Sequence, residues 1–287
     1  MGFGTSAPEM LVSGIAAATG AGGISVGNAI GSNITNAGLV IGAAALAAPL
    51  AVHSKIIRRE LPLLLLIMIL SFALVYNGEL SRVDGAILLS GFVLLLAWMA
   101  AHGIRDHRNG ADAEDALERE FRQEQPPAMS TSRALAWLLI GLLVLLGSAR
   151  VVVWGGVAIA QFFGVDDLVI GLTVVAIGTS LPELAASVVS ARKGEHDIAI
   201  GNVIGSNMFN LLGVLALPGI IAPGPLPQEI ITRDYPVMFG LTVLLLVLAR
   251  GFRERSRVTR PDGVLLVACY VVYVAWLVIS AGPARGV

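Results

Sequence analysis

Long apolar blocks alternate with short polar segments along the whole chain. Most blocks approach or exceed the roughly 20 residues that an α-helix needs to cross a lipid bilayer. They lack the two-residue alternation of barrel strands, and only helices and closed barrels satisfy their backbone polar groups in lipid. The pattern therefore predicts an all-α polytopic membrane protein with nine helices, at about 1–19, 25–52, 61–77, 84–103, 134–162, 166–191, 197–222, 235–250 and 263–281.

Composition agrees with a chain surrounded by lipid. Of its 287 residues 56% are hydrophobic and only 14% are charged, and the mean hydropathy is +0.81. Soluble domains carry about 25% charged residues. The single cysteine, Cys269, excludes a disulfide within the chain. Nothing suggests a nucleic acid or an obligate protein partner, because no basic tract is interleaved with aromatic residues.

Basic residues divide the loops into two groups. The loops after the second, fourth, sixth and eighth blocks hold three, five, two and five Lys or Arg, fifteen of the 19 in the chain. This asymmetry places those loops in the cytoplasm of a protein of the cell (inner) membrane. The longest of them, 104–132, mixes both charge signs. We expect it to be a cytoplasmic linker between a first half, 1–103, and a second half, 133–287.

The two halves share a repeated segment. Residues 4–40 align with 178–214 without a gap, at a spacing of 174, and 17 of the 37 positions are identical. Five predicted crossings separate the copies, so they are expected to face opposite sides of the membrane. Inverted repeats of this kind are typical of secondary transporters, which bind their ions at the midplane between the copies.

The first copy is the shorter one. The block at 134–162 precedes the second copy, and its counterpart would have to lie before Met1. The block at 1–19 also begins directly at its motif, without the apolar lead-in that 166–177 gives the second copy. We therefore expect the first half to lack its first helix.

Glu9 and Glu183 are the only carboxylates deep within the apolar blocks. Charged groups at this depth are costly and usually functional. One divalent cation shared by both glutamates would offset both charges, and calcium takes six to eight oxygen ligands. Hydroxyl groups flank the glutamates, and no soft ligand that would suit copper or zinc accompanies them. The hydroxyl ligands are expected from Thr5, Ser6, Thr179 and Ser180.

The rest of each motif supplies further polar groups. Pro8 and Pro182 lack an N–H group and are expected to break the helix and free carbonyls nearby. Further on, each copy carries a polar stripe with four-residue spacing on one helical face. The stripes are Asn28, Ser32 and Asn36, and Asn202, Ser206 and Asn210. Close packing of helices explains the glycines of the motif at least as well as an ion site does, and the asparagines could equally have a structural role.

The paired motifs "GTSAPE…GNAIGSNITN" and "GTSLPE…GNVIGSNMFN" resemble the two alpha-repeats of the sodium/calcium exchanger family, within the calcium/cation antiporter superfamily. The resemblance covers essentially the whole chain. It implies ten helices in two inverted halves joined by a cytoplasmic loop, nine of which are expected here. It also implies exchange of sodium for calcium by alternating access, with no cofactor. Some members carry Asp where this chain has Asn210.

The resemblance also implies a role for each matching residue. Glu9 and Glu183 would bind calcium at the centre and share sodium. Oxygens of the hydroxyl-bearing residues would add to the same site. The sodium sites around it would be completed by Ser32, Asn36, Ser206 and Asn210.

Other functions are possible for such a site. Proton-coupled exchange of calcium or another cation could use the same ligands, although all four histidines lie near loops. A passive channel suits paired, broken helices less well than a transporter that alternates around an occluded ion. An intramembrane hydrolase is disfavoured because no histidine lies near Ser6 or Ser180 to act as a base. The sequence therefore does not indicate an enzyme.

Overall fold

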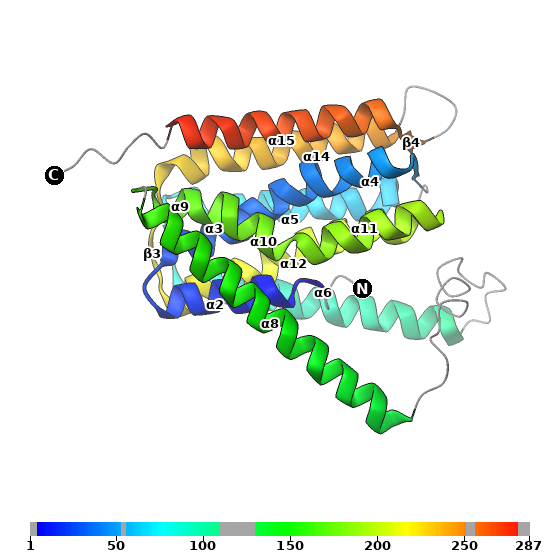
Figure 1. The fold of residues 1–287 in the computed structure, drawn as a ribbon, viewed down its shortest axis with the longest axis horizontal. Helices are drawn as coiled ribbons and strands as arrows, with labels where there is room; N and C mark the ends of the chain where they lie inside the picture. Colours follow the sequence, from blue (N-terminus) through cyan, green and yellow to red (C-terminus); the bar gives the residue numbers. More distant parts are fainter. Residues whose placement is uncertain (1–4, 53–55, 109–129, 163, 251–255, 281–287) are drawn as a thin grey trace.

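The computed structural model describes residues 5–52, 56–108, 130–162, 164–250 and 256–280. This part of the chain is helical almost throughout. Most helices run along the long axis of the molecule, and α8 crosses them obliquely at one side (Figure 1).

The first half begins with a short helix and a long apolar one. Residues Gly22–Ala47 form one helix. Its middle contains a π-helical turn (η), in which each hydrogen bond spans five residues instead of four. The elements are α2 (Ala7–Ala18), α3 (Gly22–Thr35), η1 (Asn36–Val40), α4 (Ile41–Ala47), β1 (Leu50–Ala51), η2 (Ile56–Glu60), α5 (Leu61–Val75), β2 (Glu79–Leu80) and α6 (Arg82–Arg108).

The second half contains a similar succession after one additional long helix and three short elements, α9, η3 and α10. That helix, α8, is the oblique one in Figure 1. The elements are α8 (Thr131–Phe162), α9 (Asp167–Ile170), η3 (Gly171–Val175), α10 (Ala176–Thr179), α11 (Leu181–Lys193), α12 (His196–Phe209), η4 (Asn210–Val214), α13 (Ala216–Ile221), β3 (Gly224–Pro225), η5 (Ile230–Asp234), α14 (Tyr235–Arg250), β4 (Arg257–Val258) and α15 (Arg260–Ser280).

Element boundaries recur at the spacing of the sequence repeat. Helix α3 begins at Gly22 and α12 at His196, which is 174 positions later. The turn before each helix also recurs, because Gly20 and Gly194 both have positive φ angles, of 85° and 87°. L-residues other than glycine rarely adopt this conformation. The sequence repeat is therefore also a repeat of local structure.

The halves are interleaved in space. Strand β1 pairs antiparallel with β4, and β2 with β3, so each two-stranded sheet takes one strand from each half. Helix α6 packs on α13, and α15 on α4. The helices approach closely at glycines in both pairs. A Cβ atom added to Gly85 of α6 would lie 2.9 Å from Ala216 O, and one added to Gly263 of α15 would lie 2.8 Å from Gly42 O. The two halves therefore pack against each other, and the division into 1–103 and 133–287 stays a prediction.

Polar and apolar residues are distributed as in a membrane protein. Large apolar side chains are exposed on the outer helices, for example Leu66, Leu94 and Val272. The interior instead contains many buried Ser, Thr and Asn side chains and the two glutamates of the repeated motif. An exposed apolar surface around a polar interior fits a chain whose solvent is lipid.

Five helices within the described ranges are long and apolar enough to cross a membrane, or six if one bent pair is a single span. The bent pair, Asp167–Thr179 and Leu181–Lys193, turns by 45° within the predicted block 166–191. The total of nine spans stays a prediction. The ends of the predicted linker 104–132 are helical, in α6 and α8, and its middle (109–129) lies outside the described residues. The five described helices that are long and apolar enough to cross a membrane are Gly22–Ala47, Arg82–Ala101, His196–Ile221, Ile230–Arg250 and Arg260–Ser280.

Candidate functional site

Two equivalent helix breaks form the centre of the candidate site. Ser6 precedes α2 and Ser180 lies between α10 and α11, and both have non-helical ψ angles, of 6° and 3°. A proline follows in the first turn of each helix, where its missing N–H is tolerated. Pro182 therefore cannot donate to the carbonyl of Gly178. The predicted interruption of the helix is present at both motifs.

Glu9 and Glu183 lie in the first turns of the helices that begin at these breaks. Both are completely buried, and Ser6, three residues before Glu9, donates a hydrogen bond to Glu183 Oε1 at 3.3 Å, so the two first turns are adjacent. The N-terminus of a helix is the positive end of its dipole, which stabilises a carboxylate there by about 0.3–1 kcal/mol. That is far less than the cost of burying a carboxylate. The two acids therefore need a further positive charge or protons.

The two carboxylates have different hydrogen-bond partners. Glu183 Oε1 accepts from Ser6 Oγ and from Ser206 Oγ, both at 3.3 Å. Glu183 Oε2 and both carboxylate oxygens of Glu9 have no hydrogen-bond partner among the described residues. The Thr179 hydroxyl of the other half donates to Asn28 Oδ1 at 3.0 Å. Three buried carboxylate oxygens are thus available to a ligand.

Two hydrogen bonds of the same kind join the halves. Thr179 Oγ1 donates to Asn28 Oδ1, and Thr5 Oγ1 donates to Asn202 Oδ1 at 3.4 Å. The members of these pairs are equivalent by the spacing of 174. Asn28 also donates through Nδ2 to the Glu9 carbonyl at 3.2 Å and to Ser13 Oγ at 2.9 Å. The spacing pattern placed Asn28 on a polar stripe but did not assign it this bridging position.

The predicted sodium-site asparagines begin π-helical turns. Asn36 is the first residue of η1 and Asn210 is the first residue of η4. Such turns occur frequently at functional sites. Asn36 Nδ2 donates to Asn207 Oδ1 at 3.0 Å, whereas Asn36 Oδ1 and both amide atoms of Asn210 are buried without a partner in the described structure. Asn207 was not predicted as a site residue, and apolar periodicity carried no signal for the π turns.

The ten predicted residues fall into three groups. Thr5, Ser6 and Ser206 gather around Glu183. Ser32 contacts Thr179 at 3.4 Å and, with Thr179, contacts Asn28, which holds the Glu9 carbonyl. Nine of the ten are buried and Thr5 is half-buried. The third group makes no hydrogen bond to another of the ten within the described ranges, and it consists of Ser180, Asn36 and Asn210.

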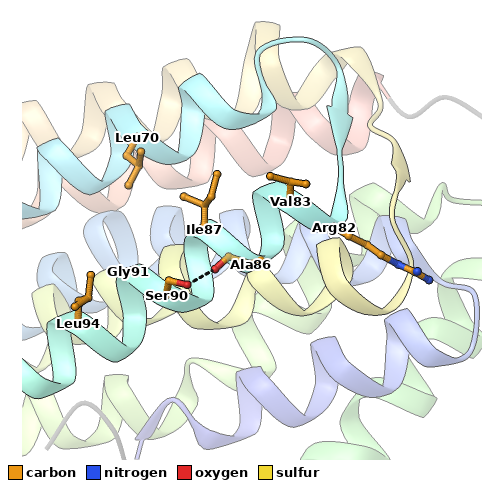
Figure 2. Close-up of a pocket in the computed structure, with 8 residues that line it drawn as sticks. All are labelled: Leu70, Arg82, Val83, Ala86, Ile87, Ser90, Gly91 and Leu94. Atoms are coloured by element: carbon orange, nitrogen blue, oxygen red, sulfur yellow. Dashed lines mark hydrogen bonds between the residues drawn. The ribbon is translucent and has the colours of Figure 1, made fainter.

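A groove of about 600 Å³ lies elsewhere, along the outer face of α6 beside α5 (Figure 2). Leu70 contributes from α5, and apolar side chains of α6 supply most of the remaining lining. Ser90 Oγ donates to the Ala86 carbonyl of its own helix at 2.7 Å, and Arg82 extends away from the other labelled residues. None of the ten predicted residues lines this groove, and it offers no set of oxygen ligands for an ion.

Comparison with known proteins identifies the family. The family model for the sodium/calcium exchanger protein matches residues 1–101 and 133–279. The chain belongs to the sodium/calcium exchanger family. It is therefore a helical, multi-pass membrane transporter of a family whose members exchange other cations for calcium.

Individual relatives agree with this assignment. The chain is 46% identical over 271 residues to the putative antiporter CaxA of Alkalimonas amylolytica, covering 94% of this chain and 83% of that protein. It is 41% identical over 275 residues to the inner membrane protein YrbG of Escherichia coli K12, covering 96% and 83%. The solved structure of the sodium-calcium exchanger NCX_Mj soaked with 10 mM Na⁺ and 10 mM Sr²⁺ matches with a TM-score of 0.70 at 34% identity. That match covers 96% of this chain and 84% of the exchanger chain.

Proposed function

We propose that this exchanger family member is a secondary active antiporter that exchanges sodium for calcium by alternating access. The observation that carries the proposal is the pair formed by Glu9 and Glu183. Each is buried in the first turn of a helix that begins at a break, and the two breaks occupy equivalent positions in the two halves. A calcium ion between them balances both charges with the hard oxygen ligands that it prefers.

The unpartnered buried atoms support an ion at this place. Ten buried side-chain atoms in the described structure have no hydrogen-bond partner, and eight of them belong to the repeated motifs. Buried polar atoms normally have partners, so this cluster of unpartnered oxygen and nitrogen atoms fits a site that binds an ion. The proposed ion ligands are the ten residues named from the sequence, with Glu9 and Glu183 central to calcium and Ser32, Asn36, Ser206 and Asn210 around the sodium positions.

The opposite directions of α2 and α11 support alternating access. From the middle of the molecule α2 extends toward the left and α11 toward the right (Figure 1). Their first turns are joined by the Ser6–Glu183 hydrogen bond. We infer that the halves are inverted repeats, so that each helix break leads toward one side of the membrane. Rocking of one set of elements against the other then exposes the same ions to either side.

Equivalent glycines of α3 and α12 have unequal surroundings. A Cβ atom added to Gly27 would lie 2.7 Å from Leu168 O, and one added to Gly31 would lie 2.7 Å from Leu172 Cα. The equivalent positions on α12, Gly201 and Gly205, have nothing within 4 Å among the described residues. Glycine pairs at this spacing let helix backbones approach closely in membranes. We infer that this face of α12 can accept an apolar helix as closely as α3 accepts η3.

The proposed orientation follows from the distribution of basic residues. We place the protein in the cell (inner) membrane with the linker 104–132 in the cytoplasm. Single cysteines in a background without Cys269 test this assignment, because a membrane-impermeant maleimide labels only residues exposed to its side. Labelling of residue 115 in inverted vesicles but not in intact cells is expected, and the reverse would refute the orientation.

Calcium flux tests the proposed function. Inverted membrane vesicles or proteoliposomes loaded with sodium should take up radioactive calcium down an outward sodium gradient. Uptake should stop when choline replaces sodium. Uptake that follows a pH gradient in the absence of sodium would identify proton coupling through the same site. Unitary currents in a planar bilayer would instead identify a channel.

A further inference from the structure

Helices α6 and α15 begin with the same cap, although they belong to different halves. Ser81 donates to Asp84 Oδ2 through its backbone N–H at 2.8 Å and through its hydroxyl at 2.6 Å. Thr259 donates to Asp262 Oδ2 in the same two ways, at 2.7 Å and 2.6 Å. The two pairs lie 178 positions apart in the sequence. The helices are therefore equivalent elements, and their residues can be compared at this spacing.

An aromatic residue occupies the same place on both helices. Gly85 of α6 and Gly263 of α15 are also 178 positions apart, and each marks a close approach to a helix of the other half. Phe92 and Tyr270 follow these glycines by seven residues, about two helical turns. Helix α6 packs on the turn η4, and α15 packs on the turn η1. Each aromatic residue thus belongs to a helix that packs on a π turn of the other half.

Tyr270 contacts η1 on both sides of Asn36. Thr35, the residue before Asn36, donates through Oγ1 to Tyr270 Oη at 3.4 Å. A Cβ atom added to Gly38, two residues after Asn36, would lie 2.8 Å from Tyr270 Cβ. Thr35 and Tyr270 are both buried. The turn is therefore held against α15 by a hydroxyl contact before Asn36 and by close packing after it.

The equivalent turn of the second half has apolar contacts instead. Phe209 is equivalent to Thr35 at the spacing of 174 and directly precedes Asn210. Its ring packs edge-on against the ring of Phe92, with the centroids 4.6 Å apart. A Cβ atom added to Gly213 would lie 3.5 Å from the Phe92 ring, an ordinary contact distance. Phenylalanine has no hydroxyl, so this aromatic pair cannot hold η4 by a hydrogen bond between its side chains.

The asparagines that begin the two turns differ in the same way. Asn36 Nδ2 donates to Asn207 Oδ1 at 3.0 Å, and Asn36 Oδ1 is buried without a partner among the described residues. Neither amide atom of Asn210 has a partner there. A ligand is presented in one geometry when packing and hydrogen bonds lock the residues that support it. The turn held by Tyr270 has this support, whereas the turn beside Phe92 lacks its hydrogen bond.

We propose that Tyr270 is a positioning residue for the ion site, which holds the turn η1 through Thr35 so that the Asn36 amide oxygen faces a bound sodium ion. The inference rests on the proposed sodium antiport and adds a residue outside the ten proposed ligands. Tyr270 acts through the turn and is not itself a ligand. Without its hydroxyl the turn adopts the binding conformation for a smaller fraction of the time, and the apparent affinity for sodium falls in proportion to that fraction.

Tyr270→Phe removes the hydroxyl and keeps the ring. The full chain in calcium-loaded proteoliposomes is assayed for calcium release at increasing sodium concentrations. The half-saturating sodium concentration is expected to rise about fivefold, the typical contribution of one neutral hydrogen bond. The maximal rate and the half-saturating calcium concentration should stay the same, because Glu183 keeps its hydrogen bonds. In detergent, the sodium concentration that gives half of the maximal thermal stabilisation should rise by the same factor.

Tyr273→Phe is the matched control. It makes the same change three residues further along α15, where the hydroxyl donates to Asp234 Oδ1 at 2.9 Å and not to η1. This variant should unfold at a lower temperature without a change in the half-saturating sodium concentration. Thr35→Val removes the other partner of the Tyr270 contact and should act like Tyr270→Phe. The double variant should add nothing further, because both changes remove one interaction.

Two results would overturn the inference. One is an unchanged half-saturating sodium concentration in Tyr270→Phe and in Thr35→Val. The other is an equal rise in Tyr273→Phe, which would show that the effect follows from a general loss of stability. A wild-type protein without sodium-for-calcium exchange contradicts the proposed function instead, and the thermal measurement with sodium then still tests the role of Tyr270.

Discussion

Ser6 Oγ donates a hydrogen bond of 3.3 Å to Glu183 Oε1, although the two residues are 177 positions apart. Ser6 precedes α2 and Glu183 lies in the first turn of α11, so the bond joins the beginnings of two helices from different halves. The equivalent hydroxyl of Ser180 has no partner in the described structure. The Glu183 carboxylate is therefore hydrogen-bonded by the other half, whereas the equally buried Glu9 carboxylate has no partner among the described residues. Such inequivalence is expected of a protein that alternates between two states.

Glu9→Gln and Glu183→Gln should each abolish calcium flux while the protein remains folded. Each variant replaces one of two completely buried carboxylates with a neutral amide, and burying an uncompensated charge is costly, so the ion-free protein should unfold at a higher temperature than the wild type. Calcium should stabilise the wild type by about 2.7 kcal/mol at one hundred times its Kd and should stabilise neither variant. Thermal unfolding in detergent, with and without calcium, measures both effects beside the flux assay.

Glu79→Gln is the matched control for these variants. Glu79 is an exposed acid on β2, so the same change there should leave flux and calcium stabilisation unaltered. Full transport by either buried variant would show that the glutamates do not bind the transported ions. A variant that fails to fold would contradict the expected gain in stability.

Asn28→Ala should lower both stability and transport. The change removes the acceptor for Thr179 and the donor to the Glu9 carbonyl and to Ser13. A buried polar group left without its partner costs about 1–3 kcal/mol, and denaturant unfolding measures this loss. Asn77→Ala, on an exposed turn, is the control. Unchanged stability in Asn28→Ala would mean that the bridge between the halves contributes nothing.

Much of the fold could be predicted from composition and repetition. Blocks of apolar residues long enough to span a bilayer predicted the long helices, and the proline in each motif predicted the breaks beside Ser6 and Ser180. The repeat carried the remaining information, because two buried glutamates at one spacing indicate a shared centre. These features are local or periodic, so a single sequence is sufficient to reveal them.

Other features depend on which elements meet in space. No local pattern predicts that β1 pairs with β4, since each strand has only two residues and the partner lies in the other half. The π turns at Asn36 and Asn210 follow from hydrogen bonding around the turn and not from hydropathy. The bridging position of Asn28 also appears only when Thr179 of the other half is placed against it. Long-range packing decides all three.

Equivalent glycine substitutions should have unequal effects in the 287-residue chain. Gly31→Ala places a Cβ atom 2.7 Å from Leu172 Cα and 2.9 Å from Ala176 Cβ, so α3 and η3 must separate. Overpacking of this kind costs about 1–3 kcal/mol. The added Cβ of Gly205→Ala meets none of the described residues within 4 Å. This variant should be neutral or slightly stabilising, because alanine favours a helix over glycine by up to about 1 kcal/mol.

Thermal unfolding of both variants measures the difference. Gly31→Ala should unfold at a lower temperature than Gly205→Ala, because only the added Cβ at Gly31 meets a neighbouring backbone. An equal loss of stability for both variants would mean that the space beside Gly205 is occupied in solution.

Asp234→Asn should destabilise the protein strongly without changing the charge of the ion site. Asp234 is completely buried, accepts two hydrogen bonds from Arg233 and one of 2.9 Å from Tyr273 Oη, and so links the beginning of α14 to α15. Removing one partner of a buried pair leaves the other charge uncompensated and costs about 3–5 kcal/mol. Tyr273→Phe, which keeps the ion pair, should cost only about 1 kcal/mol. Glu229→Gln changes a neighbouring exposed acid and serves as the control. Denaturant unfolding ranks the three variants, and equal stability of Asp234→Asn and Glu229→Gln would show that the link between α14 and α15 is not needed for the fold.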